Sequence, residues 1–140
     1  MERRHETQIV ADLRAPHVAR TWMAEQLEPL GVEPEVAESA LLLLSELVTN
    51  VVTHTDSAPT IGIEVGGDRV LVEVGDSDRR PAAIRDQEAG PLGGWGLRIV
   101  DQIASSWGVR PGPDGAKVVW FAIDRPASGP ADGDPRPSGP

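Results

Sequence analysis

The chain has 140 residues, the usual size of a single domain with one hydrophobic core. Its formal net charge of −9 repels a polyphosphate backbone and argues against binding to nucleic acid, but not against a small metal-chelated anion. Because there is no cysteine, disulfide scaffolds, zinc fingers and cysteine nucleophiles are excluded. The longest aliphatic run, Ala40–Leu44, is far shorter than the roughly 20 residues of a membrane span, and the charged start does not resemble a signal peptide. The expected location is therefore the cytoplasm, without a membrane partner.

A short strand and a helix are expected near the start of the chain. We place the strand at Gln8–Leu13 and treat residues 1–7 as a flexible N-terminus. Pro16 suits the first turn of a helix, where its missing N–H would be unpaired in any case. Apolar side chains at helical spacing continue this helix to about Leu30, and Gly31 follows as a stop signal.

The second predicted helix begins at Pro34 and is apolar nearly all round. Its main buried face is formed by apolar residues three or four positions apart, namely Val36, Ala40, Leu43, Leu47 and Val51. Neighbouring leucines and a valine make the opposite side apolar as well. We therefore expect a central helix that is packed on two sides.

A β-hairpin is expected after the central helix. Alternating residues predict strands at Ile61–Val65 and Val70–Val74, and the Gly-Gly-Asp sequence at residues 66–68 has the composition of a tight turn. The following segment, Arg79–Gly94, is polar and contains several glycines and prolines. About 16 residues without signals for a helix or strand are typical of a functional or mobile loop.

A helix and a final strand complete the predicted domain, which spans residues 8–124. Apolar residues from position 97 onward predict a helix that ends near Trp107-Gly108, and Val118–Ile123 predicts the strand. Residues 125–140 consist largely of Pro, Gly, Ser and Asp, so they bury too little apolar surface to offset the entropy lost on ordering. This tail is expected to be disordered.

Three polar residues follow one line along the otherwise apolar central helix. Glu46, Asn50 and His54 are separated by four positions each, so they project from one side of the helix. From spacing alone, Glu46 and Asn50 could equally lie on an exposed strip or satisfy each other's hydrogen bonds. A functional interpretation therefore needs support from the rest of the chain.

Two further segments carry residue types that suit a polar ligand. Asp76 follows the second hairpin strand, where a buried carboxylate can accept a hydrogen bond from an exocyclic amine. The sequence Gly-Gly-Trp-Gly-Leu at residues 93–97 leads into the last helix, where backbone N–H groups can approach a phosphate. Taken singly, Asp76 is also an ordinary turn residue, and the glycines are also an ordinary loop.

In this order and at this spacing, the three segments resemble the N-box, G1-box and G2-box of the GHKL ATP-binding superfamily. The resemblance covers about residues 8–123 and is closest to the short anti-sigma-factor serine/threonine kinases. The matching residues are Glu46, Asn50, His54, Asp76, Gly93, Gly94, Gly96, Leu97, Trp107, Gly108, Lys117, Val119 and Trp120. The resemblance implies an α+β two-layer sandwich (the Bergerat fold), in which three helices cover one face of a mixed, mainly antiparallel sheet.

The resemblance also implies roles for individual residues and a set of partners. Asn50 would be the Mg²⁺ ligand that joins the protein to the phosphates of ATP, and Glu46 would be the base that takes the proton of a substrate hydroxyl. Asp76 would accept from the N6 amine of adenine. The lid over the phosphates would be formed by Gly93, Gly94, Gly96 and Leu97. The implied partners are a sigma factor and an anti-anti-sigma protein with a STAS domain, and a homodimer through the sheet or first helix is left open.

Some residues depart from the pattern of the family. Residues 76–80 contain no glycine, Val118 stands where threonine is frequent, and Trp95 stands where a basic or polar lid residue is frequent. These departures favour an alternative, an interaction module of the same fold with little or no transferase activity. A detached catalytic domain of a histidine kinase is a third hypothesis, against which the missing Asp-x-Gly-x-Gly motif and phosphoacceptor helix argue.

Overall fold

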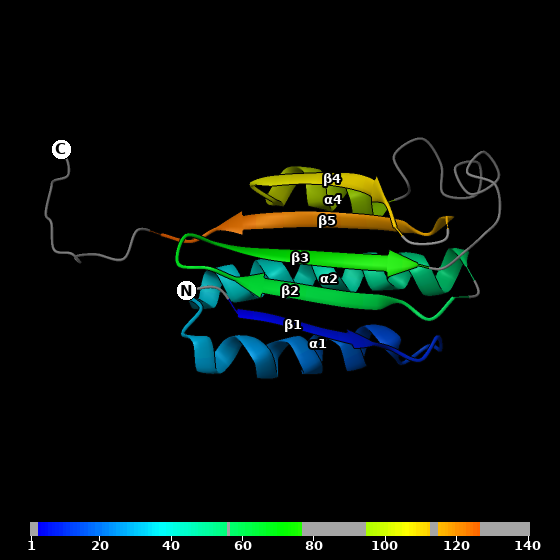
Figure 1. The fold of residues 1–140 in the computed structure, drawn as a ribbon, viewed down its shortest axis with the longest axis horizontal. Coiled ribbons are helices and arrows are strands. Elements are labelled where there is room, and N and C mark those ends of the chain that lie inside the picture. Colours follow the sequence, from blue (N-terminus) through cyan, green and yellow to red (C-terminus); the bar gives the residue numbers. More distant parts are fainter. Residues whose placement is uncertain (1–2, 56, 77–94, 113–114, 127–140) are drawn as a thin grey trace, which may run out of the picture.

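The computed structural model describes residues 3–55, 57–76, 95–112 and 115–126 of the chain. In chain order, the elements are β1 (Arg3–Gln8), α1 (Ala15–Leu27), the short 3-10 helix η1 (Glu28–Leu30), α2 (Pro34–His54), β2 (Thr60–Val65), β3 (Arg69–Asp76), α4 (Trp95–Ile103), β4 (Ser106–Pro111) and β5 (Lys117–Asp124). They form two layers, one of strands and one of helices (Figure 1).

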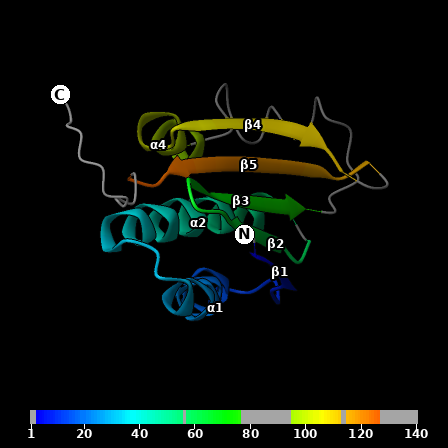
Figure 2. The same ribbon diagram turned by 60° about the vertical axis from the view of Figure 1, so that its left-hand side comes forward.

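The five strands form one sheet in the order β1-β2-β3-β5-β4. The helices α1, α2 and α4 cover the same face of this sheet, as the two ribbon views show together (Figure 1, Figure 2). The expected α+β two-layer sandwich with three helices on one face is therefore confirmed. The sheet was expected to be mixed and mainly antiparallel. Within the described residues every strand pair is antiparallel.

The core lies between the helices and the covered face of the sheet. The register places Val72 of β3 opposite Ile63 of β2 and Phe121 of β5, and all three side chains are fully buried. Because side chains alternate along a strand, residues two positions away share the same face. These positions are also buried, and they are Ile61, Val65, Val70, Val74, Val119 and Ile123.

The central helix of the helical layer is α2, as expected. It contacts α1 and α4 within its own layer, and β3 and β5 of the sheet. Its buried residues are Val36, Ala40, Leu43, Leu44, Leu47, Val48 and Val51. By length and composition alone α2 could cross a membrane, but this is weak evidence because the core helix of a soluble protein passes the same test. In this fold its buried residues pack against the sheet and the other helices, whereas Leu42 is 44% exposed.

The boundaries between the first two helices follow the sequence signals. The helix expected to run to about Leu30 is α1 followed directly by η1. Gly31 then adopts a left-handed conformation with φ of 69°, which costs glycine little because it has no Cβ. The second helix begins at Pro34, as predicted.

The first strand lies earlier than predicted. The prediction of a strand at Gln8–Leu13 is wrong, because β1 spans Arg3–Gln8 and lies in the segment expected to be a flexible N-terminus. These residues are polar and carry no apolar alternation that would mark a strand. The strand is instead held at the sheet edge by its backbone pairing with β2 and by Arg4, which donates to Glu73 Oε1 at 2.8 Å.

A second correction concerns the helix predicted to end near Trp107-Gly108. The helix ends at Ile103, and Trp107 and Gly108 belong to β4, which pairs with β5. The indole of Trp120 lies over Gly108, so that a Cβ atom there would be only 2.8 Å from Trp120 Nε1. Trp107 Nε1 donates to Asp101 Oδ1 at 2.8 Å and so connects β4 to α4. These contacts are made between separate elements, which local sequence patterns do not report.

The uncovered face of the sheet carries a chain of charges that runs across its whole width. Glu73 on the middle strand β3 accepts from Arg4 of β1 at 2.8 Å and from Arg110 of β4 at 2.6 Å. Burial raises the pKa of the Glu73 carboxyl, but the hydrogen bonds from both arginines outweigh this effect and the pKa is lowered. The bond to Glu73 in turn raises the pKa of Arg4.

Arg125, the residue directly after β5, forms a second set of charged contacts. Arg125 donates to Glu33 Oε1 at 2.9 Å, to the Gly66 carbonyl at 2.8 Å and to the Gly31 carbonyl at 3.2 Å. It therefore joins the start of α2 to the β2–β3 hairpin, and its bond lowers the pKa of Glu33. Arg125 and Pro126, predicted to belong to a disordered tail at 125–140, lie within the described residues, whereas residues 127–140 lie outside them.

We expect Arg125→Met to lower the free energy of unfolding by about 1–2 kcal/mol, because four hydrogen bonds of a mostly buried guanidinium are lost. Urea denaturation followed by circular dichroism would measure this change. Arg20→Met on the exposed side of α1 is the matched control and should change stability by less than about 0.5 kcal/mol. Equal stability of the two variants would contradict the assigned role of Arg125.

The stabilising effect of Glu73 should depend on pH. Because the pKa of Glu73 is lowered in the folded state, the carboxylate stabilises the fold above the ordinary value of 4.5 and loses this effect as pH falls below it. Glu73→Gln should therefore be less stable than the wild type at pH 7, by about 1 kcal/mol, since both arginines are partly exposed. The difference should shrink in urea titrations between pH 5 and pH 3. A difference that stays constant would show that Glu73 acts without its charge.

Candidate functional site

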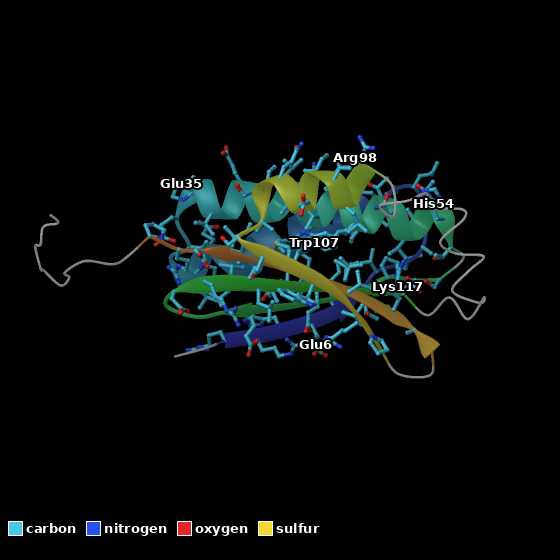
Figure 3. All side chains as sticks on the ribbon, turned by 90° about the horizontal axis from the view of Figure 1, so that it is seen from above. Glu6, Glu35, His54, Arg98, Trp107 and Lys117 are labelled. Carbon is cyan, nitrogen blue, oxygen red and sulfur yellow. The ribbon has the colours of Figure 1, made fainter. Side chains whose placement is uncertain are left out.

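A pocket lies where the C-terminal half of α2 meets the ends of β3 and β5 and the start of α4. It contains about 570 Å³ of empty space, including a part open to solvent. Its wall is formed by Leu47, Asn50, Val51, His54, Thr55, Val74, Asp76, Leu97, Lys117 and Val119. Figure 3 shows two of them, His54 and Lys117, at the same end of the molecule and in opposite layers.

The helical wall of the pocket is one stripe of α2. Leu47, Asn50, Val51 and His54 are spaced by three, one and three positions, which places them on neighbouring lines of the same side of the helix. The stripe thus alternates apolar and polar side chains. Thr55 ends the helix in an extended conformation, and its hydroxyl donates to the Val51 carbonyl at 2.7 Å.

The wall formed by the sheet combines an apolar part with a charged part. Val74 and Val119 are register partners, and so are Asp76 and Lys117 at the adjacent strand ends. All four lie on the face covered by the helices. Asp76 is only 7% exposed and is the one charged residue in the buried class among the residues that the structure describes. Because burial of a carboxylate is costly unless it is hydrogen-bonded or paired, Asp76 requires polar partners at this position.

Most of the described residues that were predicted for the site meet in this pocket. Asn50, Asp76 and Leu97 line it together, although they come from three different elements. His54 lines it as well. Glu46 lies one turn before Asn50 on α2 and is half-buried, but it is not part of the pocket wall.

The glycine segment is described only in part. Gly96 lies in the first turn of α4, next to Leu97 of the pocket wall. Gly93 and Gly94, predicted as part of the lid, lie outside the described residues. The same holds for the polar segment from 79 to 94 that was predicted as a functional or mobile loop.

Sequence reasoning assigned no role to two polar residues of the pocket wall, Thr55 and Lys117. Val118, which stands where threonine is frequent in the family, lies on the uncovered face and pairs with Gly75. The residue of β5 that faces the pocket is its neighbour Lys117. The alternation of β5 was the signal that could have shown this, since Lys117 has the parity of the buried residues Val119 and Phe121.

The side chains of the wall suit a flat polar ring that carries a phosphate chain. Apolar residues such as Leu47, Val51 and Val74 can contact a ring face, and the Asp76 carboxylate can accept from an amine at the ring edge. The Asn50 side-chain carbonyl is an oxygen ligand of the type that Mg²⁺ prefers. Within the described residues there is no group of three or more His, Cys, Asp or Glu that could hold a metal ion. A single side-chain ligand such as Asn50 suits a metal whose other ligands come from phosphates and water.

Comparison with known proteins gives a consistent result. A family model described as "Histidine kinase-like ATPase domain" matches residues 9–121, which is most of the chain. A search of curated protein sequences found no match. The family match covers every residue of the pocket wall.

Two solved structures share the fold. One, from Mycobacterium tuberculosis, contains the RsbU and RsbW domains of Rv1364c; it is 19% identical with a TM-score of 0.66, and the match covers 89% of this chain and 34% of that chain. The chain thus spans about a third of that structure's length. The other is the SiaB–SiaC complex from Pseudomonas aeruginosa, at 13% identity with a TM-score of 0.59, covering 86% of this chain and 89% of that chain. At these identities the similarity concerns the fold alone.

Proposed function

The chain belongs to the family of histidine kinase-like ATPase domains, and from this membership we propose that it is an ATP-binding regulatory serine/threonine kinase of the anti-sigma-factor type. The observation that carries the proposal is the convergence of Asn50 and Asp76 on one pocket. Asn50 comes from α2 and Asp76 from the end of β3, and both lie beside an apolar wall. This arrangement supplies one group for the metal ion at the phosphates of a nucleotide and one group for its nucleobase.

The proposed roles divide along the pocket. Asp76 accepts from the N6 amine of adenine, while Asn50 holds Mg²⁺ through its side-chain carbonyl oxygen. When bound, Mg²⁺ neutralises charge on the phosphates during phosphoryl transfer. The role proposed for Gly93, Gly94, Gly96 and Leu97 is that of a lid over the phosphates. Glu46, one turn from Asn50 on α2, takes the proton of the substrate hydroxyl.

We place this activity in a cytoplasmic regulatory circuit. The proposed partners are a sigma factor and an anti-anti-sigma protein with a STAS domain, whose serine or threonine receives the phosphate. Support comes from the solved structures of the same fold, one with an RsbW domain and one a SiaB complex with SiaC. Both structures contain more than one protein or domain, RsbU with RsbW and SiaB with SiaC, which fits a role in regulating another protein.

A second candidate function is an ATP-binding interaction module with little or no kinase activity. The observation that favours it is the place of Glu46, which does not line the pocket in which Asn50 and Asp76 meet. A base that takes a proton from the substrate must lie close to the transferred phosphate. The two candidates share nucleotide binding and differ only in phosphoryl transfer.

Asp76→Asn should weaken binding of Mg-ATP at least tenfold. The substitution keeps the size of the side chain but removes a charged acceptor for the adenine amine, and a charge-assisted hydrogen bond is worth about 1.5–3 kcal/mol. Isothermal titration calorimetry on the purified chain would measure the affinity. Asp68→Asn in the exposed hairpin turn is the matched control and should bind like the wild type. A folded wild type that binds no ATP would contradict the proposed function altogether.

Glu46→Gln should separate the two candidate functions. If Glu46 is the base, the variant should bind Mg-ATP like the wild type but transfer phosphate to a STAS-domain substrate about 100 to 10,000 times more slowly. Incorporation of acid-stable phosphate would be measured under single-turnover conditions. Glu35→Gln in the first turn of α2 is the control on the same helix. Transfer that is absent from the wild type as well would favour the interaction module.

A further inference from the structure

One charged residue of the pocket has no role in the proposed function. Lys117, the first residue of β5, is the only lysine of the chain. It is half-buried, its side chain lies on the face of the sheet covered by the helices, and it lines the pocket. Figure 3 shows it below the end of α2 that carries His54.

The position of Lys117 relative to Asp76 is set by the sheet. The two residues are register partners at adjoining ends of β3 and β5. Directly opposed residues of an antiparallel pair have Cβ atoms about 4.5–5.5 Å apart, so both side chains reach the same small region. An acidic acceptor and a cationic donor therefore stand side by side at one end of the pocket.

The surroundings of Lys117 favour a ligand over a structural partner. Within the described residues, no hydrogen bond or ion pair of its ammonium group is formed, although charged residues elsewhere on the sheet make several. The pocket wall around it also contains the apolar side chains of Val119 and Leu97. A cationic donor in such surroundings is stabilised by an acceptor that a bound ligand brings.

We propose that Lys117 determines base specificity by donating a hydrogen bond to the ring nitrogen N1 of adenine, beside the N6 amine that Asp76 accepts from. This inference rests on the proposed function, because it requires ATP in the pocket. Adenine presents a donor at position 6 and an acceptor at the adjacent position 1. The adjacent acceptor and donor of Asp76 and Lys117 match this order.

The same pair discriminates against guanine. Guanine has an acceptor at position 6 and a donor at position 1, so both contacts become repulsive when it adopts the orientation of adenine. Lysine suits the task because its compact ammonium group can turn one N–H toward a single acceptor, whereas the planar fork of arginine is best matched by two acceptors side by side. The pair therefore reads two atoms of one edge of the base.

The test compares Mg-ATP with Mg-1-deaza-ATP, in which a C–H group replaces N1. By calorimetry, the wild-type chain should bind the analogue about tenfold more weakly than ATP, and GTP more weakly still. Lys117→Met should bind ATP about tenfold more weakly and should no longer distinguish ATP from the analogue. Arg69→Met, at the exposed start of β3, is the control and should keep the discrimination of the wild type.

A chemical measurement on the wild type gives independent evidence. Because Lys117 is the only lysine, an amine-acylating reagent followed by peptide mass spectrometry reports on this one side chain. Mg-ATP should protect Lys117 strongly and should leave the α-amino group of the expressed chain unprotected. Mg-1-deaza-ATP at the same concentration should protect it less.

The outcomes separate this inference from the proposed function. A wild type that binds ATP but binds 1-deaza-ATP equally well would overturn the role of Lys117 and leave nucleotide binding intact. Tighter binding of GTP than of ATP would also overturn it, because the pair would then read guanine. A wild type that binds no nucleotide would overturn both proposals.

Discussion

The candidate site depends on the packing of α2 against the middle strands of the sheet. The apolar side of α2 rests on buried side chains of β3 and β5, among them Val72 and Phe121. This contact fixes both the rotation and the height of the helix over the sheet, because close-packed side chains tolerate little displacement. Asn50, which lies on the pocket side of that helix, is thereby held near Asp76 at the end of β3.

The position of the site follows from where this apolar layer stops. Val74 and Val119 are the last apolar pair of β3 and β5 on the covered face, and the next pair on that face is Asp76 and Lys117. Polar groups at this border are shielded from water on one side, so that hydrogen bonds to a ligand are stronger than they would be on an open surface. The net charge of −9 does not oppose an anionic ligand here, since a local lysine and a bound metal act at shorter range than the charge of the whole molecule.

The two faces of the sheet use different interactions. The covered face is held by apolar packing, whereas the uncovered face is held by the charges of Arg4, Glu73 and Arg110, which connect both edge strands to the middle of the sheet. Arg125 adds a further ionic contact at the opposite end of the domain from the pocket, where it joins the start of α2 to the hairpin. The start of α2 is thus held by one ion pair, between Arg125 and Glu33, whereas its C-terminal end forms part of the pocket wall.

The sequence by itself determined the elements that carry strong local signals. The start of α2 at Pro34, the left-handed Gly31 and the β2–β3 hairpin are all encoded by short-range conformational preferences, and the line from Asn50 to His54 is encoded by helical periodicity. Only the tertiary structure decided what depends on pairing between distant segments. The polar strand β1 and the strand β4 that contains Trp107 owe their conformation to neighbouring strands, and the place of Lys117 beside Asp76 is a matter of register. Register is set by the buried faces of the whole sheet, because a slip of one residue would turn every side chain of β5 to the other face.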